Sequence, residues 1–107
     1  MAAQNEFQRV ATVTEMTDGE MKLVTINNTE VCLARIGAQY FAMNNECTHA
    51  GAMLSLGPLD TENYQLQCPL HGSVFDVRTG NVVKGPADEP EQVYAVKIEG
   101  EDILVAL

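Results

Sequence analysis

The stretch QCPLHGSVFD, residues 67–76, places a cysteine and a histidine three positions apart within a short turn that also contains proline and glycine. A second such pair lies upstream in ECTHAG, residues 46–51. The chain has only three cysteines and two histidines. The two stretches therefore contain both histidines and all but one of the cysteines, and this concentration needs a chemical reason.

The spacing of these residues is typical of metal ligands. The two stretches read Cys47-x-His49 and Cys68-x-x-His71, with eighteen residues between them. Thiolate and imidazole groups are strong ligands for borderline and soft metal ions. A glycine follows each histidine within two residues, and glycine lets the backbone approach a bound group closely. Cys47, His49, Cys68 and His71 are therefore candidate ligands of one metal centre.

Two kinds of centre fit four such ligands. Two cysteines and two histidines also satisfy tetrahedral zinc, which makes a structural zinc module in a binding protein one alternative. Zinc sites usually pair like ligands, as in C-x-x-C, whereas each pair here is mixed, and this favours an iron–sulfur cluster. The remaining cysteine, Cys32, alternates with Val31 and Leu33 in an expected strand. We expect it to be a buried free thiol with no ligand role.

The sequence outside the two pairs predicts an all-β fold. Apolar residues recur with period two, and no window of helical length has a convincing 3.6-residue period. Asn27-Asn28 tolerates left-handed backbone and suits a tight hairpin turn, and a single helical turn is expected near residues 50–55. The expected strands are MKLVTI (21–26), EVCLARI (30–36), YFAMN (40–44), QVYAVKIEG (92–100) and ILVAL (103–107).

The middle of the chain differs from both ends. From Asn44 to about Pro86 the apolar runs shorten and glycine and proline become frequent. We interpret residues 44–86 as a loop-rich insertion between flanking β-hairpins, within a single domain spanning residues 1–107. All four candidate ligands lie in this insertion, and long loops inside a compact domain are usually functional.

Composition limits the cellular setting. Hydrophobic residues make up 46% of the chain, but no apolar run approaches twenty residues, so a membrane span is not expected. The start, MAAQNEFQRV, has neither a basic leader nor an apolar stretch, so no signal peptide is expected. An odd number of cysteines is poor support for a disulfide scaffold and suits a reducing cytoplasm. We therefore expect a cytoplasmic protein.

The charge limits the partners. The formal net charge is −9, from 15 acidic and 6 basic side chains. Such a surface repels phosphate backbones and anionic lipid headgroups, so nucleic acid and membrane are poor partners. A protein with a basic docking face is a better one, although the charge also fits a role in solubility alone. Carboxylates that could steer docking include Glu46, Asp60, Glu62 and Asp88.

The paired motif resembles the Rieske [2Fe–2S] domain. The resemblance rests on C-x-H and C-x-x-H, on CPLHG (68–72), on the downstream FDVRTG (75–80), and on GPA (85–87) at the place of the family's proline loop. It covers nearly the whole chain. It implies the Rieske fold, in which antiparallel sheets form a sandwich- or barrel-like base and a loop-rich cluster-binding subdomain is inserted.

The resemblance also implies a cofactor and its ligands. In this family one iron of a [2Fe–2S] cluster takes two cysteines and the other takes two histidines. By resemblance, Cys47 and Cys68 bind one iron, and His49 and His71 bind the other, solvent-facing iron. Each stretch then supplies one ligand to each iron, which explains why cysteine and histidine occur in pairs.

Departures from the respiratory branch of the family indicate a low reduction potential. Respiratory Rieske proteins carry a disulfide between two extra cysteines, and Ala52 and Leu70 occupy those places here. Phe75 stands where those proteins have a tyrosine that donates a hydrogen bond, although Ser73 could restore one donor. Rieske potentials span roughly −150 to +300 mV. We expect a negative value near the lower end.

A soluble, acidic, low-potential Rieske protein resembles the ferredoxins of bacterial aromatic ring-hydroxylating dioxygenase systems. There, electrons pass from an NAD(P)H-dependent flavin reductase, through the ferredoxin, to a terminal non-haem iron oxygenase. The chain itself is not expected to be an enzyme. An oxygenase iron needs two histidines and a carboxylate, yet both histidines are already assigned, and no glycine pair forms the Gly-x-Gly of a dinucleotide site.

The chain is therefore expected to be a monomeric electron carrier, with Leu70, Pro86 and nearby apolar residues forming a dry rim around the cluster. Three other roles stay open. The chain could be a Rieske component of another oxidoreductase, such as a nitrite reductase small subunit or a monooxygenase ferredoxin. It could also be a redox sensor, or the zinc module described above.

Overall fold

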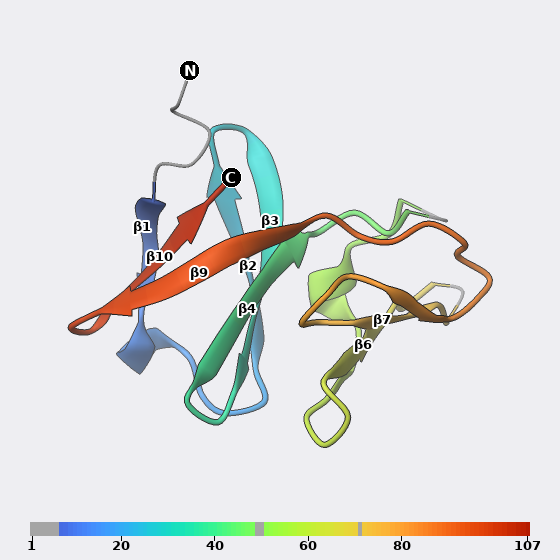
Figure 1. The fold of residues 1–107 in the computed structure, drawn as a ribbon, viewed down its shortest axis with the longest axis horizontal. Coiled ribbons are helices and arrows are strands. Elements are labelled where there is room, and N and C mark those ends of the chain that lie inside the picture. Colours follow the sequence, from blue (N-terminus) through green and yellow to red (C-terminus); the bar gives the residue numbers. More distant parts are fainter. Residues whose placement is uncertain (1–6, 49–50, 71) are drawn as a thin grey trace.

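The computed structural model describes residues 7–48, 51–70 and 72–107, which form two antiparallel sheets (Figure 1). The larger, which we call the base sheet, contains in spatial order β1 (Phe7–Thr12), β10 (Asp102–Ala106), β9 (Val93–Glu99), β4 (Gln39–Asn44), β3 (Thr29–Ile36) and β2 (Met21–Ile26). The smaller, which we call the inserted sheet, contains β5 (Leu59–Asp60), β6 (Gln65–Gln67), β7 (Val74–Asp76) and β8 (Val82–Lys84).

Two short 3₁₀ helices complete the described elements, η2 (Val13–Glu15) after β1 and η3 (Leu54–Leu56) before β5. The base sheet curls until its edge strands β1 and β2 come into contact, which gives it the shape of a nearly closed barrel (Figure 1). The all-β expectation is confirmed. In the described parts of the chain, neither helical segment has the length and apolar character that a membrane crossing requires.

The expected hairpins of the base sheet are present. Asn27 and Asn28 have φ angles of 50° and 70°, so both occupy the left-handed region that the turn between β2 and β3 requires. The pairing of Ile26 with Thr29 closes that hairpin. One strand of the base was not expected from the sequence: β1 pairs with β10, with an irregularity between Arg9 and Ala11.

Strand β3 is buried on both faces. Val31 and Leu33 point into the barrel core, together with Ile103 and other apolar residues. Cys32 lies on the opposite face, in a second core that lies between the two sheets. This two-sided burial follows from the period of two in a strand, and it explains why the apolar run in β3 is continuous rather than alternating.

Cys32 is the buried thiol that its sequence pattern predicts. It is 1% exposed and takes part in no disulfide. Its Sγ lies 3.6 Å from Met21 Sδ as a hydrogen-bond donor. Burial raises the pKa of the Cys32 thiol to about 12, and the charge of Glu91 adds to this effect. The thiol is therefore neutral and unreactive at physiological pH.

The inserted sheet consists of strands too short to be visible in the sequence pattern. One row of apolar side chains crosses all four strands in register, since Leu59 pairs with Leu66, Leu66 with Phe75, and Phe75 with Val82. Phe75 and Leu66 are almost completely buried in the core between the sheets. Cross-strand neighbours of this kind are the unit of sheet stabilisation.

The insertion leaves and re-enters the base sheet at one place. Strands β4 and β9 are neighbours, and Met43 pairs with Val93. Beyond this pair, the Asn44 N–H donates a hydrogen bond to the Gln92 carbonyl at 2.9 Å. The chain between residues 45 and 92 therefore begins and ends at the same end of two paired strands, and the expected insertion 44–86 lies almost wholly within it.

Tyr64 joins the inserted sheet to the base. Its hydroxyl donates to Gln39 Oε1 at 3.0 Å, and its ring meets that of Phe41 edge-on with centroids 5.9 Å apart. On its other side the Arg78 guanidinium carbon lies 4.7 Å from the Tyr64 ring centroid. Two residues of β4 and one residue of the turn after β7 thus hold this tyrosine.

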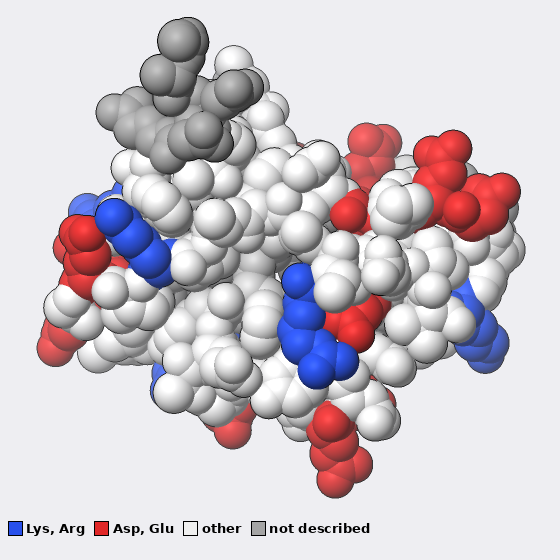
Figure 2. All heavy atoms as spheres, in the orientation of Figure 1, with Lys and Arg blue, Asp and Glu red and all other residues white. Residues whose placement is uncertain are grey.

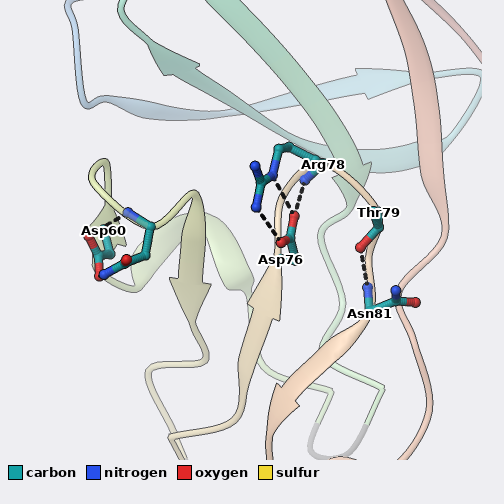
Figure 3. A network of polar contacts seen from close by, with 6 residues as sticks. Asp60, Asp76, Arg78, Thr79 and Asn81 are labelled. Carbon is teal, nitrogen blue, oxygen red and sulfur yellow. Dashed lines mark hydrogen bonds and ion pairs between the residues drawn. The ribbon is translucent and has the colours of Figure 1, made fainter.

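Polar contacts fix the turns of the inserted sheet (Figure 3). Asp60 accepts hydrogen bonds from the backbone N–H groups of Glu62 and Asn63 in the turn after β5. After β7, Arg78 forms an ion pair with Asp76 at 2.9 Å. These turns lie at the ends of β6 and β7 away from Cys68 and Ser73, so their contacts shape the sheet and not the ligand stretches.

Candidate metal centre

The first ligand stretch starts from a buried asparagine. Asn45 is 0% exposed, and its side-chain oxygen accepts a hydrogen bond from the Ser55 N–H at 2.9 Å. Its backbone N–H donates to Glu30 in β3 at 3.0 Å, and its carbonyl accepts from Leu54 in η3 at 2.7 Å. Glu46 and Met53 then form an isolated bridge. These contacts tie both ends of the stretch to each other and to β3.

The two ligand stretches share one backbone geometry, which we call the ligand turn. In the first turn, the Cys47 carbonyl accepts from the Gly51 N–H at 2.9 Å, and the Cys47 N–H donates to the Ala52 carbonyl at 2.9 Å. In the second turn, the Cys68 carbonyl accepts from the Gly72 N–H at 3.1 Å. The Cys68 N–H donates to the Ser73 carbonyl at 2.7 Å.

A glycine closes each ligand turn in the left-handed region. The φ angles of Gly51 and Gly72 are 70° and 81°, which other residues adopt only with strain. Each glycine stands four positions after its cysteine, so the match between the two turns extends to the residue type that the backbone requires. The described residues of the two turns thus match in their closing hydrogen bonds and in the closing glycine.

The two cysteines lie in the same packed cluster. Cys47 is 3% exposed and Cys68 is 1% exposed, and both belong to the core between the sheets. The turn after η3 packs closely against the second stretch, because a Cβ atom at Gly57 would overlap the Gln67 carbonyl oxygen and crowd the ring of Pro69. The structure therefore brings together the two predicted sulfur ligands from opposite sides of η3 and β5.

The two predicted histidine ligands, His49 and His71, lie outside the described residues, so their assignment as ligands stays a prediction. Within the described ranges 7–48, 51–70 and 72–107 no group of three or more potential metal-binding side chains occurs.

The GPA segment packs against the second ligand turn. Ser73 is 0% exposed, and its Oγ accepts a hydrogen bond from the Ala87 N–H at 2.9 Å. A hydroxyl group that accepts still has its own proton to donate. Because Ser73 follows the second turn directly, its O–H is a buried donor in the neighbourhood of Cys68. Ala87 itself is 4% exposed.

The segment after GPA holds the first ligand turn. The Thr48 N–H donates to Glu91 Oε2 at 2.8 Å, and the Thr48 hydroxyl donates to the Glu89 carbonyl at 2.8 Å. Burial raises the pKa of Glu91 to about 7, against the hydrogen bond from Thr48, and the charge of Glu46 raises it further. Sequence reasoning missed Glu91, because one acid among 15 carries no pattern of its own.

Acidic side chains gather at the end of the molecule that carries the inserted sheet and the segment before β9 (Figure 2). Glu46 in the first ligand stretch and Asp88 and Glu89 after GPA are exposed. Of the other two steering candidates, Asp60 is the last residue of β5 and Glu62 lies in the turn between β5 and β6. The side chain of Leu70, expected at the apolar rim, is 61% exposed.

The described residues fit a [2Fe–2S] cluster. Its sulfur ligands must be thiolates held at fixed separation. Cys47 and Cys68 meet this need, since each is held at both its N–H and its carbonyl within a closed turn. The buried hydroxyl of Ser73 adds a donor of the kind that tunes cluster potentials.

Comparison with known proteins agrees with this geometry. A family model described as the Rieske [2Fe-2S] domain matches residues 6–105. The ferredoxin component of the naphthalene 1,2-dioxygenase system of Pseudomonas aeruginosa is 36% identical over 93 residues, which cover 87% of this chain and 88% of the relative.

Two solved structures are similar over almost their full length. The ferredoxin of carbazole 1,9a-dioxygenase from Nocardioides aromaticivorans IC177 has a TM-score of 0.91 and 37% identity, covering 94% of this chain and 96% of its own. A chain in the complex of reduced oxygenase and oxidized ferredoxin in carbazole 1,9a-dioxygenase has a TM-score of 0.87 and 31% identity, covering 94% and 92%. This chain belongs to the Rieske [2Fe–2S] domain family, whose cofactor is one Rieske-type [2Fe–2S] cluster.

Proposed function

We propose that this protein is the ferredoxin component of an aromatic ring-hydroxylating dioxygenase system, carrying single electrons from an NAD(P)H-dependent flavin reductase to a terminal non-haem iron oxygenase. It is an electron-transfer component and not itself an enzyme. The similar naphthalene 1,2-dioxygenase protein is also a ferredoxin component. The observation that carries the proposal is the pair of equivalent ligand turns, in a fold similar to that of a carbazole 1,9a-dioxygenase ferredoxin.

The proposal assigns the ligands by position in the two turns. Cys47 and Cys68 hold one iron, and His49 and His71 hold the other. When bound, the cluster supplies one-electron oxidation and reduction. The chain's own part is to hold the ligands in rigid turns and to keep the cysteines buried.

The partner proposal rests on a related complex. A structure similar to this chain contains an oxygenase together with its ferredoxin in carbazole 1,9a-dioxygenase. We assign the same kind of partner here, with the exposed Leu70 and Pro86 forming the apolar rim of the contact. Transient redox contacts are small, so a few apolar residues are enough. The protein then works as a cytoplasmic monomer, and residues 1–107 form one domain.

Electron paramagnetic resonance tests the assignment directly. We expect the dithionite-reduced protein to give the spectrum of a mixed-ligand [2Fe–2S] cluster. Cys68→Ser and His71→Ala should abolish or alter that spectrum, while Cys32→Ser should leave it unchanged. Protein without iron, or with a spectrum typical of all-thiolate coordination, would refute the proposal. Colourless protein that binds zinc would support the structural zinc module instead.

The reduction potential is a second test. Phe75 cannot donate a hydrogen bond to sulfur, whereas the buried Ser73 hydroxyl can. With one such donor retained and the disulfide of the respiratory branch absent, we expect a negative midpoint near the lower end of the Rieske range. A redox titration with a midpoint well above zero would contradict this expectation.

Charge steering is the third test. Glu46 and Asp88 lie in the segments around the ligand turns, and long-range charge acts mainly on the association rate. We expect turnover with the reductase or the oxygenase to fall as ionic strength rises, in line with Debye screening. Equal rates at low and high salt would remove steering from the proposal without affecting the cluster assignment.

A further inference from the structure

Glu91 is the one acidic side chain that is buried among the residues the structure describes. It is 5% exposed, and its backbone N–H donates to the Gly80 carbonyl at 2.8 Å. The two ion pairs found in the described parts of the chain join Arg78 to Asp76 and Lys97 to Glu99. No Lys or Arg therefore forms an ion pair with Glu91 within those parts.

A buried carboxylate without a cationic partner costs free energy. The charge of Glu46 adds to this cost, because it raises the pKa of Glu91 and so disfavours its ionised form. What Glu91 does have is the hydrogen bond from the Thr48 N–H at 2.8 Å. This hydrogen bond links Glu91 to the ligand turn that contains Thr48.

A comparison of the two ligand turns shows what that hydrogen bond provides. Thr48 follows Cys47, and the corresponding residue after Cys68 is Pro69. Proline has no N–H group and a fixed φ angle, so the second turn has no donor to satisfy at this position and is already rigid there. In the first turn Thr48 does have an N–H, which the closing hydrogen bonds of the turn do not use and which donates to Glu91 instead.

We infer that Glu91 is a positioning residue for the first ligand turn, doing through a hydrogen bond to Thr48 what Pro69 does covalently in the second turn. Its buried negative charge also lowers the reduction potential of the cluster, whose proposed ligands are Cys47, Cys68, His49 and His71. A charge in a poorly solvated site acts strongly on its neighbours, and a negative charge opposes the arrival of an electron. The inference rests on the proposed ligand assignment.

Three variants separate charge from position. Glu91→Gln keeps an oxygen that can accept from Thr48 but removes the charge. Glu91→Asp keeps the charge but shortens the side chain by one methylene group, so the carboxylate no longer reaches Thr48. Glu89→Gln is the matched control, since the exposed Glu89 binds Thr48 through its backbone carbonyl and not its side chain.

Redox titration and iron content are measured on the iron-loaded protein at pH 9, where the carboxylate of Glu91 is ionised. We expect Glu91→Gln to retain iron and to favour reduction about tenfold, which is 59 mV for one electron. We expect Glu91→Asp to shift the redox equilibrium by less than twofold but to lose iron to a chelator several times faster than the parent. Glu89→Gln should match the parent in both measurements.

Several results would overturn the inference. One is a redox equilibrium constant of Glu91→Gln within twofold of the parent value. The others are a shift of the redox equilibrium in Glu89→Gln as large as that in Glu91→Gln, and a Glu91→Asp variant that retains iron as long as the parent. If the Glu91 variants do not fold, hydrogen exchange at the Thr48 amide of the iron-loaded parent decides, because the inference requires strong protection there. A parent without iron would refute the proposed function instead, so the two failures are distinguishable.

Discussion

The base sheet and the inserted sheet are both antiparallel, yet they are held together by different means. The strands of the base are five to eight residues long and enclose a barrel core. The strands of the inserted sheet are two or three residues long. A strand of that length buries at most one or two side chains on each face, and a sheet with so small an apolar face is not stable alone.

The inserted sheet therefore depends on contacts outside itself. Its single apolar row packs against the face of β3 and β4 that carries Cys32 and Met43. Tyr64 links the inserted sheet to Gln39 and Phe41 of β4. Metal binding to residues that are apart in the unfolded chain contributes directly to folding free energy. The difference between the two sheets suggests that the base folds by its own pattern, whereas the inserted sheet needs both the base and the bound cluster.

The largest effect should follow from loss of the cluster. We expect Cys68→Ser to lose iron and to increase hydrogen exchange by several orders of magnitude in residues 45–92, while the base strands keep most of their protection. The physical reason is that the two ligand turns would lose the group that joins them. Hydrogen exchange followed by mass spectrometry compares the two regions in one experiment.

Cys32→Ser is the matched control for this variant. Cys32 is buried in the same core as Cys68 but lies in β3, so its replacement should leave iron bound and the insertion protected. Equal loss of protection in both sheets of the Cys68→Ser protein would show that the two regions unfold as one unit, and the comparison would fail.

The next largest effect compares one core residue from each region. Phe75 and Leu33 are both 0% exposed, in the inserted sheet and in the barrel core respectively. Phe75→Ala should cost about 3–5 kcal/mol and Leu33→Ala about 2–5 kcal/mol of folding free energy. We expect Phe75→Ala to release iron at denaturant concentrations below the unfolding of the base, because the row across the inserted sheet is broken.

Thermal or urea unfolding followed by both far-ultraviolet circular dichroism and visible absorbance separates these outcomes. In Leu33→Ala the two signals should change together, since the inserted sheet rests on the base. Coincident transitions in Phe75→Ala as well would contradict a separately weakened insertion.

The base was predictable because its residues carry local signals. Val96 and Ile98 alternate with Lys97 and Glu99 along a strand, and Asn27-Asn28 marks a tight turn whose positive φ angles suit those residues. Period and turn chemistry act over a few residues, so a sequence shows them directly. Strand β1 was missed because FQRVAT alternates poorly, and its pairing with β10 is a contact between the two ends of the chain.

In the candidate site, the sequence pattern pointed only to the proposed ligands, whose assignment stays a prediction. Cysteine and histidine are rare in this chain, so their pairing stands out. The supporting residues do not stand out: Glu91 and Ser73 act through contacts with residues 43 and 14 positions away along the chain. The row from Leu59 to Val82 was equally invisible, because strands of two or three residues are shorter than any period that could reveal them.

A smaller effect tests the close packing of Gly57 against the second ligand stretch. Gly57 leaves no room for a side chain, since a Cβ atom would overlap the backbone oxygen of Gln67. We expect Gly57→Ala to destabilise the protein by about 1–3 kcal/mol, as overpacking does, and to accelerate iron release.

Gly37→Ala is not a suitable control, because the φ of 62° at Gly37 would strain any other residue without a steric clash. Ala38→Ser, in the exposed turn after β3, should instead leave unfolding unchanged, and equal stability of Gly57→Ala and the parent would contradict the close approach.

The smallest effect compares one ion pair from each sheet. Asp76 in the inserted sheet pairs with Arg78 at 2.9 Å and has an 18% exposed side chain, whereas Lys97 and Glu99 in the base pair at 3.1 Å with 47% and 63% exposure. The side-chain hydrogen bond from Arg78 holds the pKa of Asp76 below its ordinary value of 3.8.

Because the pKa of Asp76 is lowered in the folded state, the unfolded chain binds the proton more readily. The ionised carboxylate therefore stabilises the fold above about pH 4. This contribution is lost as the pH falls through the folded-state pKa. We expect Asp76→Asn to cost less than about 1 kcal/mol at pH 7, because solvent screens a partly exposed pair. Glu99→Gln should have no measurable effect. Urea unfolding at pH 7, 5 and 3.5 measures the free energy of unfolding of the parent and of Asp76→Asn. The difference between the two should be the same at pH 7 and pH 5 and smaller at pH 3.5. A difference that grows as the pH falls would assign the role of Asp76 to something other than its charge.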